Sequence, residues 1–270
     1  MPLLFARFGI IFCVTLPAVG AAEQAGAAGS GFELGFVDAS GVERRAALAA
    51  FAGVRFEEGL PVRRFRWSRG LEYFPGWWWA ATTGRHVGYE SWLERDHVRA
   101  LDFDPEIVGI ASQPFWLYWT SERGRRRHPP DYFARRADGT GVVIDVRADD
   151  QIEAEDAEAF AATAEACTWL GWEFRRVGEI DPVLGGNVRW PARYRHPRCA
   201  GPADITRRLR EAFARPAPLL AGAAEAGDPV ATLPALFHMM WYQELVADVT
   251  QARLGPATLV WAACPGCDHR

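Results

Sequence analysis

Two aspartates and one arginine fall where a predicted β-hairpin would bring them together. Asp131 opens the first strand of this hairpin, and Asp145 and Arg147 lie near the end of the second strand. Alternate residues of a strand share a face, so Asp145 and Arg147 are expected to point the same way. Antiparallel pairing about a turn at Asp138-Gly139 brings Asp131 to the same end of the hairpin. Two converging carboxylates suit Mg²⁺, which bridges to phosphate and activates water, and a nearby cation would stabilise developing negative charge.

A third carboxylate could come from the helix that precedes the hairpin. Glu90 and Glu94 are four residues apart and share a helix face. The run from Ser91 to Glu94 also matches a capping box, in which the glutamate only bonds the start of the helix. Asp131 and Asp145 could likewise be solvated acids at strand ends. The residues alone leave these alternatives open.

The elements that would position these side chains follow from hydrophobic periodicity and turn residues. Helices are expected at 90–103 and 152–170. Strands are expected at 32–38, 42–47, 62–67, 107–112, 115–120, 132–136, 142–147 and 172–177. Residues 73–79 are interpreted as an aromatic loop whose tryptophans pack in a core or at an interface, and 124–130 as a basic loop. The order of helices and strands predicts an α/β domain with helices against a mixed sheet.

The remainder of the chain predicts a second domain. Residues 182–202 have no regular pattern, whereas 203–214, 218–226 and 228–241 are expected to be helices. A hairpin of 245–249 and 258–262 follows them. Three helices followed by a hairpin form the outline of a winged helix. Cys264 and Cys267 could be half of a zinc site, although no second pair of ligands is visible.

The composition is that of a globular protein. The chain has 270 residues, a net charge of −4, 49% hydrophobic residues and 24% charged residues, which argues against a disordered or collagen-like chain. The near-neutral charge excludes a strongly basic coat for nucleic acid but leaves room for a local basic face. All 30 basic residues are arginine, so chemistry that needs a lysine amine is excluded. Five cysteines do not indicate a disulfide framework, and no apolar run reaches the 18 or more residues of a membrane span.

The first 22 residues permit two interpretations. Arg7, an apolar stretch and the small residues Ala18 to Ala22 are typical of a signal peptide. A leader without function in an alanine-rich chain would look the same. The remainder of the chain has to decide between them.

Five short motifs lie in order at 89–96, 101–105, 113–114, 130–133 and 143–147. Together they resemble the TnsA-type endonuclease subunit of heteromeric bacterial transposases. The similarity covers about residues 60–180 and, more loosely, the winged-helix-like tail. It implies a restriction-endonuclease-like core of the PD-(D/E)xK type, with a mixed sheet flanked by helices.

The resemblance also implies a metal site. Glu94, Asp131 and Asp145 would hold Mg²⁺, for which Mn²⁺ can substitute. Arg147 occupies the position at which the family has a lysine, and this is the main departure. Arginine is permanently protonated and cannot act as a base, but it could stabilise charge on the phosphate.

The basic residues before Asp131 are expected to help place the DNA strand. They are Arg123, Arg125, Arg126, Arg127 and His128, together with Gln113 from the preceding motif. A solvated charge run is the alternative interpretation.

The whole sequence thus predicts a Mg²⁺-dependent DNA endonuclease subunit that hydrolyses phosphodiester bonds at transposon ends. A DDE-type transposase subunit and an ATPase regulator would be its partners. The expected parts are a leader and linker at 1–31, a β-rich extension at 32–75, a nuclease-like core at 76–182 and a winged-helix-like domain at 195–263. Work on chromosomal DNA implies the cytoplasm and no membrane, so the leader would not be used for export. The alternative function is an inactive nuclease-fold scaffold that binds DNA and transposition partners.

Overall fold

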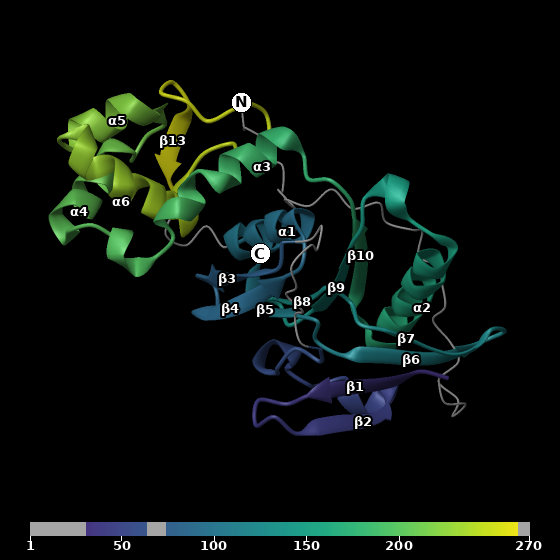
Figure 1. Cartoon of the computed structure of the whole chain (residues 1–270). Helices are drawn as coiled ribbons and strands as arrows, with labels where there is room; N and C mark the ends of the chain where they lie inside the picture. The colour runs from purple at the N-terminus through teal and green to yellow at the C-terminus, as the bar shows by residue number, and fades with distance from the viewer. Residues whose placement is uncertain (1–30, 64–73, 264–270) are drawn as a thin grey trace, which may run out of the picture. The chain divides into compact units, whose positions relative to one another are not determined.

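The computed structural model describes residues 31–63 and 74–263, which belong to two compact units. Unit 1 is Met1–Glu179 and unit 2 is Ile180–Arg270. The fold is mixed α/β, with antiparallel and mixed sheets flanked by helices (Figure 1). Within the described ranges, no helix has both the length and the apolar character needed to cross a membrane. The predicted leader, most of the strand predicted at 62–67, and Cys264 and Cys267 lie outside the described residues; Val62 and Arg63 belong to no strand.

A mixed four-stranded sheet of unit 1 carries the predicted aspartates. Its order is β10-β9-β8-β5, made of β5 (Ile107–Ser112), β8 (Tyr132–Arg136), β9 (Gly141–Val146) and β10 (Glu173–Val177). The strands β5, β8 and β9 pair antiparallel, and β10 pairs parallel to β9. A parallel pair needs a long crossover, and helix α2 (Ala154–Leu170) provides it.

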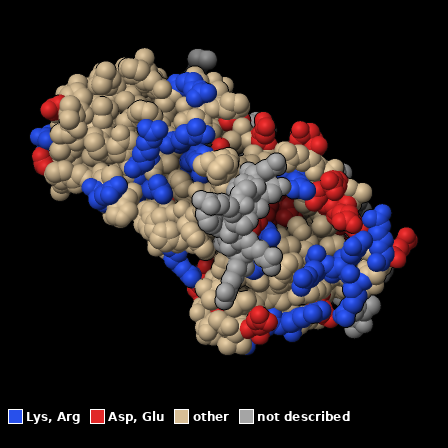
Figure 2. All heavy atoms as spheres, in the orientation of Figure 1, with Lys and Arg blue, Asp and Glu red and all other residues tan. Residues whose placement is uncertain are grey.

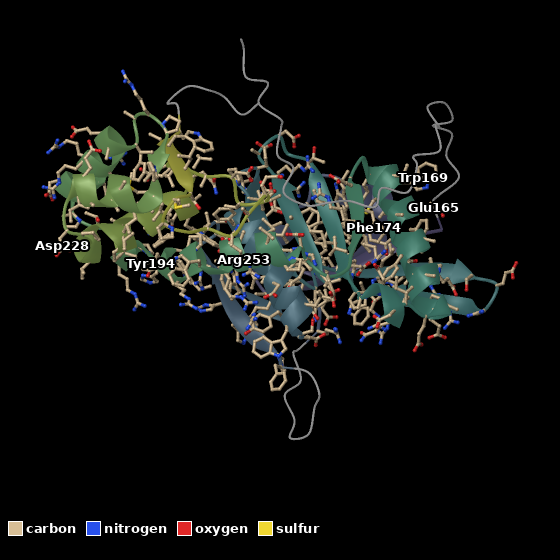
Figure 3. The ribbon with its side chains drawn as sticks, turned by 90° about the horizontal axis from the view of Figure 1, so that it is seen from above. Glu165, Trp169, Phe174, Tyr194, Asp228 and Arg253 are labelled. Atoms are coloured by element: carbon tan, nitrogen blue, oxygen red, sulfur yellow. The ribbon has the colours of Figure 1, made fainter. Side chains whose placement is uncertain are left out.

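Helix α2 starts and ends at identifiable signals. Glu153 and Asp156 form a capping box at its start, and Gly171 ends it with a left-handed φ of 67°. One side of the helix packs against β10, where Phe174 lies against it (Figure 3). The rings of Phe160 and Phe174 are 6.3 Å apart between centroids. The helix is therefore fixed along the strand next to β9.

A second four-stranded sheet joins the N-terminal extension to this unit. Its order is β2-β1-β6-β7, made of β1 (Glu33–Val37), β2 (Glu43–Ala47), β6 (Trp116–Ser121) and β7 (Gly124–His128). The prediction of a basic loop at 124–130 is wrong over 124–128, because these residues pair with β6 from Leu117↔His128 to Ser121↔Gly124. Arginine is tolerated there since β7 lies at the edge of its sheet.

Helix α1 (Trp92–Phe103) packs on a hairpin that the sequence did not predict. The strands are β3 (Gly76–Ala80) and β4 (Arg85–Tyr89), so the predicted loop at 73–79 is wrong from Gly76 onward. Trp78 is buried, and its Nε1 donates to the carboxylate of Asp102 at 2.9 Å. The amides of the β3-β4 turn also donate to Asp102, which fastens this hairpin to α1.

One apolar core connects both sheets and α2. It combines rings from the extension with residues of β6, β8, β9 and α2, among them Phe36, Phe56, Leu117, Phe133, Val143 and Ala166. Phe56 contacts Phe36, Phe115, Phe133 and Trp172 edge to face at centroid distances of 5.0 to 5.6 Å, a favourable arrangement for aromatic rings. The described residues of unit 1 also form 3₁₀ turns at Leu48–Phe51, Phe56–Glu58 and Asp149–Gln151. Those of unit 2 form 3₁₀ turns at Pro191–Tyr194 and Pro197–Cys199.

Unit 2 contains the three predicted helices and the predicted hairpin. They are α4 (Ala203–Ala212), α5 (Leu219–Ala226), α6 (Pro229–Trp241), β12 (Leu245–Val246) and β13 (Leu259–Ala262). A short strand β11 (Ala217–Pro218) extends the hairpin to the order β11-β13-β12. The prediction that 182–202 is irregular is wrong, because α3 (Pro182–Arg189) forms there. Asp181 caps α3 and Pro182 occupies its first turn, both of which favour a helix start.

Candidate functional site

The pairing of β8 with β9 brings Asp131 and Asp145 together, as the sequence predicts. Tyr132 pairs antiparallel with Ile144, so the same register sets Asp131, the residue before Tyr132, opposite Asp145, the residue after Ile144. The Oδ2 of Asp131 accepts a hydrogen bond from the amide of Val146 at 2.8 Å. Both aspartates therefore belong to one end of the hairpin.

Asp145 is almost completely buried, and one of its oxygens has no partner. Its exposed fraction is 1%. Oδ1 lies 2.8 Å from Nε2 of His128, whereas Oδ2 has no hydrogen-bond partner among the described residues. An unpartnered buried carboxylate oxygen is costly, so this atom is a natural ligand position for a cation.

The electrostatics of the cluster follow from burial and neighbouring charges. Burial raises the pKa of Asp131 well above its ordinary value, and the carboxylates of Glu94 and Asp145 raise it further. Burial opposes the charged form of His128, but the Asp145 carboxylate outweighs it, so the pKa of His128 is raised. A cation bound among these carboxylates would relieve their repulsion.

Glu94 makes one of the two hydrogen bonds of a capping box and a second bond just outside it, because Ser91 is the cap and Glu90 precedes it. Its Oε2 accepts from the amide of Glu90 at 2.8 Å, and its own amide donates to Oγ of Ser91 at 3.1 Å. Burial raises the pKa of Glu94, and the hydrogen bond from Glu90 opposes this. Because Glu94 also raises the pKa of Asp131, it caps α1 and at the same time contributes negative charge to the cluster.

Arg147 forms its ion pair away from the two aspartates. Strand β9 ends at Val146, so the alternation that relates Arg147 to Asp145 no longer holds at this residue. Its Nε and Nη2 donate to Oδ2 of Asp156 at 3.2 and 3.0 Å. Asp156 belongs to the capping box of α2, and the guanidinium is thereby attached to the start of that helix.

Arg63 is a cation of the cluster that the sequence did not single out. It forms an ion pair with Glu90. Its backbone carbonyl and its guanidinium also bond the side-chain amide of Gln113 at 3.2 Å, in the amide orientation that satisfies both groups. Gln113 is buried, has a left-handed φ of 46°, and donates its backbone amide to the carbonyl of Asp131 at 2.8 Å. The only sequence signal for Arg63 was its place within the segment of resemblance.

The predicted DNA-binding arginines are divided between two faces of β7. Arg126 and His128 share one face, and Arg126 lies 3.9 Å from both Glu155 and Glu158 of α2. Arg127 belongs to the other face and stacks on Trp116 at 4.4 Å. Figure 2 shows basic atoms gathered over the region of β6 and β7, next to acidic atoms over α2.

Two further members of the predicted set lie at the β6-β7 turn. Arg123 is 3.9 Å from Glu158, and Arg125 is exposed on the face of Arg127. Because Arg123 and Arg126 face glutamates of α2, the exposed basic face of this strand consists of Arg125 and Arg127.

The arrangement fits a divalent cation held by two carboxylates. Within 31–63 and 74–263, no group of three or more His, Cys, Asp or Glu side chains is arranged to hold a metal ion. Mg²⁺ commonly binds through one or two carboxylates, with water and substrate phosphate as its other ligands. Asp131 and Asp145 meet this requirement, and the unpartnered Oδ2 of Asp145 supplies a ligand atom.

No protein-family model matches this chain, and no curated protein matches it.

Proposed function

We propose that this protein is a Mg²⁺-dependent DNA endonuclease subunit of a heteromeric transposase, which hydrolyses phosphodiester bonds at transposon ends. The observation that carries the nuclease part is the pair of a half-buried Asp131 and a buried Asp145, with an unpartnered oxygen on Asp145. The assignment to transposition rests on the resemblance in the five motifs, and so do the proposed partners, a DDE-type transposase subunit and an ATPase regulator.

Each residue of the site has a role in this proposal. Asp131 and Asp145 hold the ion, which when bound would activate water and neutralise charge on the phosphate. The amide of Val146 orients Asp131, and His128 orients Asp145. Glu94 fixes the start of α1 and adds negative charge that favours a divalent cation. The exposed Arg125 and Arg127 bind backbone phosphates beside the site.

The architecture of both units supports the proposed endonuclease. The mixed sheet β10-β9-β8-β5 is flanked by helices, as a restriction-endonuclease-like core requires. The helices and hairpin of unit 2 have the outline of a winged helix. An enzyme of this kind works on chromosomal DNA, so we place its activity in the cytoplasm.

A specific observation favours the alternative, an inactive scaffold. Arg147, at the position of the family's lysine, is paired with Asp156. A chain that has lost this cation from the cluster could retain binding to DNA and partners without cutting.

Nicking of supercoiled plasmid distinguishes the two functions. Wild-type protein, Asp131→Asn and Asp145→Asn are incubated with Mg²⁺ or Mn²⁺, alone and with the transposase encoded beside the gene. Asp138→Asn is the matched control, because Asp138 lies at the opposite, exposed end of the same hairpin. The endonuclease requires metal-dependent nicking that is lost in the first two variants and kept in the control. Folded protein that never nicks, with the partner present, would establish the scaffold.

A further inference from the structure

The acidic cluster contains a cation from outside the predicted motif. We infer that Arg63, and not Arg147, is the cation of this site and that its guanidinium binds a non-bridging oxygen of the phosphodiester held at Asp131 and Asp145. This inference rests on the proposed function, since the phosphodiester is its substrate.

The backbone connects the segment of Arg63 to Asp131 through Gln113. The amide of Val62 donates to the carbonyl of Gln113 at 3.0 Å, and the amide of Gln113 donates to the carbonyl of Asp131 at 2.8 Å. Three segments that are distant in sequence therefore lie side by side, in the order Arg63, Gln113, Asp131. Gln113 has a left-handed φ of 46°, which is uncommon for a non-glycine residue.

The side chain of Arg63 is held but not enclosed. Gln113 and Glu90 orient the guanidinium, while 42% of the side chain remains exposed. A guanidinium has five N–H donors, so Arg63 can keep both contacts and still donate to a phosphate oxygen. The fixed planar arrangement of these donors suits phosphate better than an ammonium group does.

The charge of Arg63 reaches the carboxylates of the cluster. Its guanidinium pairs with Glu90, whose backbone amide donates to Oε2 of Glu94. It also bonds the side chain of Gln113, whose backbone amide donates to the carbonyl of Asp131. Arg147 instead donates to Asp156 at the start of α2. Two arginines are thus present near the hairpin end, and their surroundings assign them different roles.

A comparison of Arg63→Gln with Arg147→Gln tests the inference on the full chain. The first readout is Mn²⁺ affinity by calorimetry, which does not depend on cutting. Removal of a positive charge from the cluster should tighten Mn²⁺ binding about tenfold in Arg63→Gln and leave it unchanged in Arg147→Gln. A change of that size in Arg147→Gln alone would overturn the inference.

The second readout is the rate of plasmid nicking. Arg63→Gln should lower it by about a hundredfold or more, since such a loss is typical for one group that stabilises transition-state charge. Arg63→Lys should restore part of the rate, and Arg147→Gln should stay within about threefold of wild type. Circular dichroism and thermal unfolding exclude misfolding as the cause.

The outcomes separate this inference from the proposed function. Wild-type protein that binds Mn²⁺ and nicks DNA, with Arg63→Gln equal to wild type in both readouts, overturns the role of Arg63 alone. Tighter Mn²⁺ binding in Arg63→Gln, with no nicking by any variant, supports Arg63 as the cation and counts against the endonuclease. Absence of Mn²⁺ binding in every variant overturns both.

Discussion

Replacement of Asp131 by asparagine should stabilise the protein at neutral pH. Asparagine keeps the size of the side chain and an oxygen that can accept from the Val146 amide, but it removes a charge. That charge is half-buried near the carboxylates of Glu94 and Asp145; partial burial raises its pKa, and the two carboxylates raise the pKa further. The native aspartate is therefore held in an unfavourable place, as is common for groups that a bound cation must compensate.

The size of the effect follows from the hairpin register. The register that pairs Tyr132 with Ile144 sets Asp131 opposite Asp145, and the Cβ atoms of opposed strand positions are roughly 5 Å apart. Two like charges at that separation repel by about 3 kcal/mol at an effective dielectric constant of about 20. Attraction to Arg63 offsets part of this, so we expect a gain of about 2 kcal/mol in the free energy of unfolding. For a unit of this size the gain corresponds to an increase of about 4–8 °C in Tm.

The pH dependence gives the sign of the effect. A carboxyl group whose pKa is raised in the folded state adds stability below its ordinary value of 3.8, and this contribution is lost as the pH rises toward the folded-state pKa. Asparagine does not titrate. The difference in stability between Asp131→Asn and wild type should be largest near pH 8 and should shrink toward zero as the pH falls below the ordinary value for aspartate.

Thermal unfolding of metal-free protein across this pH range measures the difference. Asp138→Asn is the control, because the hydrogen bond from the Thr140 amide lowers the pKa of Asp138, so its replacement should not raise Tm. An Asp131→Asn variant that is no more stable than wild type at pH 8, or whose advantage persists in acid, would refute the reasoning.

Three substitutions elsewhere test how the folds of the two units are stabilised. Asp102→Ala removes the acceptor for Trp78 and the β3-β4 turn and should cost about 3 kcal/mol in urea unfolding; a loss below about 1 kcal/mol would show that α1 does not depend on this anchor. Asn187→Ala breaks three hydrogen bonds of 2.7 to 2.8 Å to the segment that follows β12 and should lower the stability of unit 2 by about 3 kcal/mol, as measured by hydrogen exchange, with unit 1 unchanged. Gly222→Ala places a Cβ 2.4 Å from the ring of Phe213 and should cost about 1–3 kcal/mol, whereas Gly255→Ala, with open space around it, is the control in the same unfolding assay.

The hairpin of the site could be predicted because its signals are local. Alternation in the strands and the Asp138-Gly139 turn set the register, and the register alone places Asp131 beside Asp145. The buried run of β9 and the Ser91 cap of α1 are also visible in the sequence. These features depend on neighbours within a few residues, for which pattern and chemistry agree.

The wrong predictions concern two segments, β3 and β7, whose residue pattern does not indicate the strand pairing that they form. The tryptophans at 77–79 show no alternation of residue type, yet they form a strand that pairs with β4. The buried Trp78 stabilises this strand through its hydrogen bond to Asp102. The arginines of β7 look like a solvated loop, although cross-strand pairs with β6 hold them. In both cases pairing with another strand determines the conformation, and the residues of the segment do not indicate which strand that is.

Arg63 escaped prediction for the same reason on a longer scale. Its partners Glu90 and Gln113 are 27 and 50 residues away, and only the folded chain brings them together. Conversely, Arg147 has the expected place in sequence but turns to Asp156 after β9 ends. Sequence spacing therefore located the carboxylates of the candidate site better than it located its cation.

A Mn²⁺ titration of the purified full-length chain tests the metal site most directly, with Asp131→Asn and Asp145→Asn measured beside wild type. If these two carboxylates hold the ion, wild type should bind one Mn²⁺ per chain and both variants should lose at least about tenfold in affinity, which is about 1.4 kcal/mol. Wild-type affinity in both variants, with folding intact, would contradict a metal site at the end of the β8-β9 hairpin.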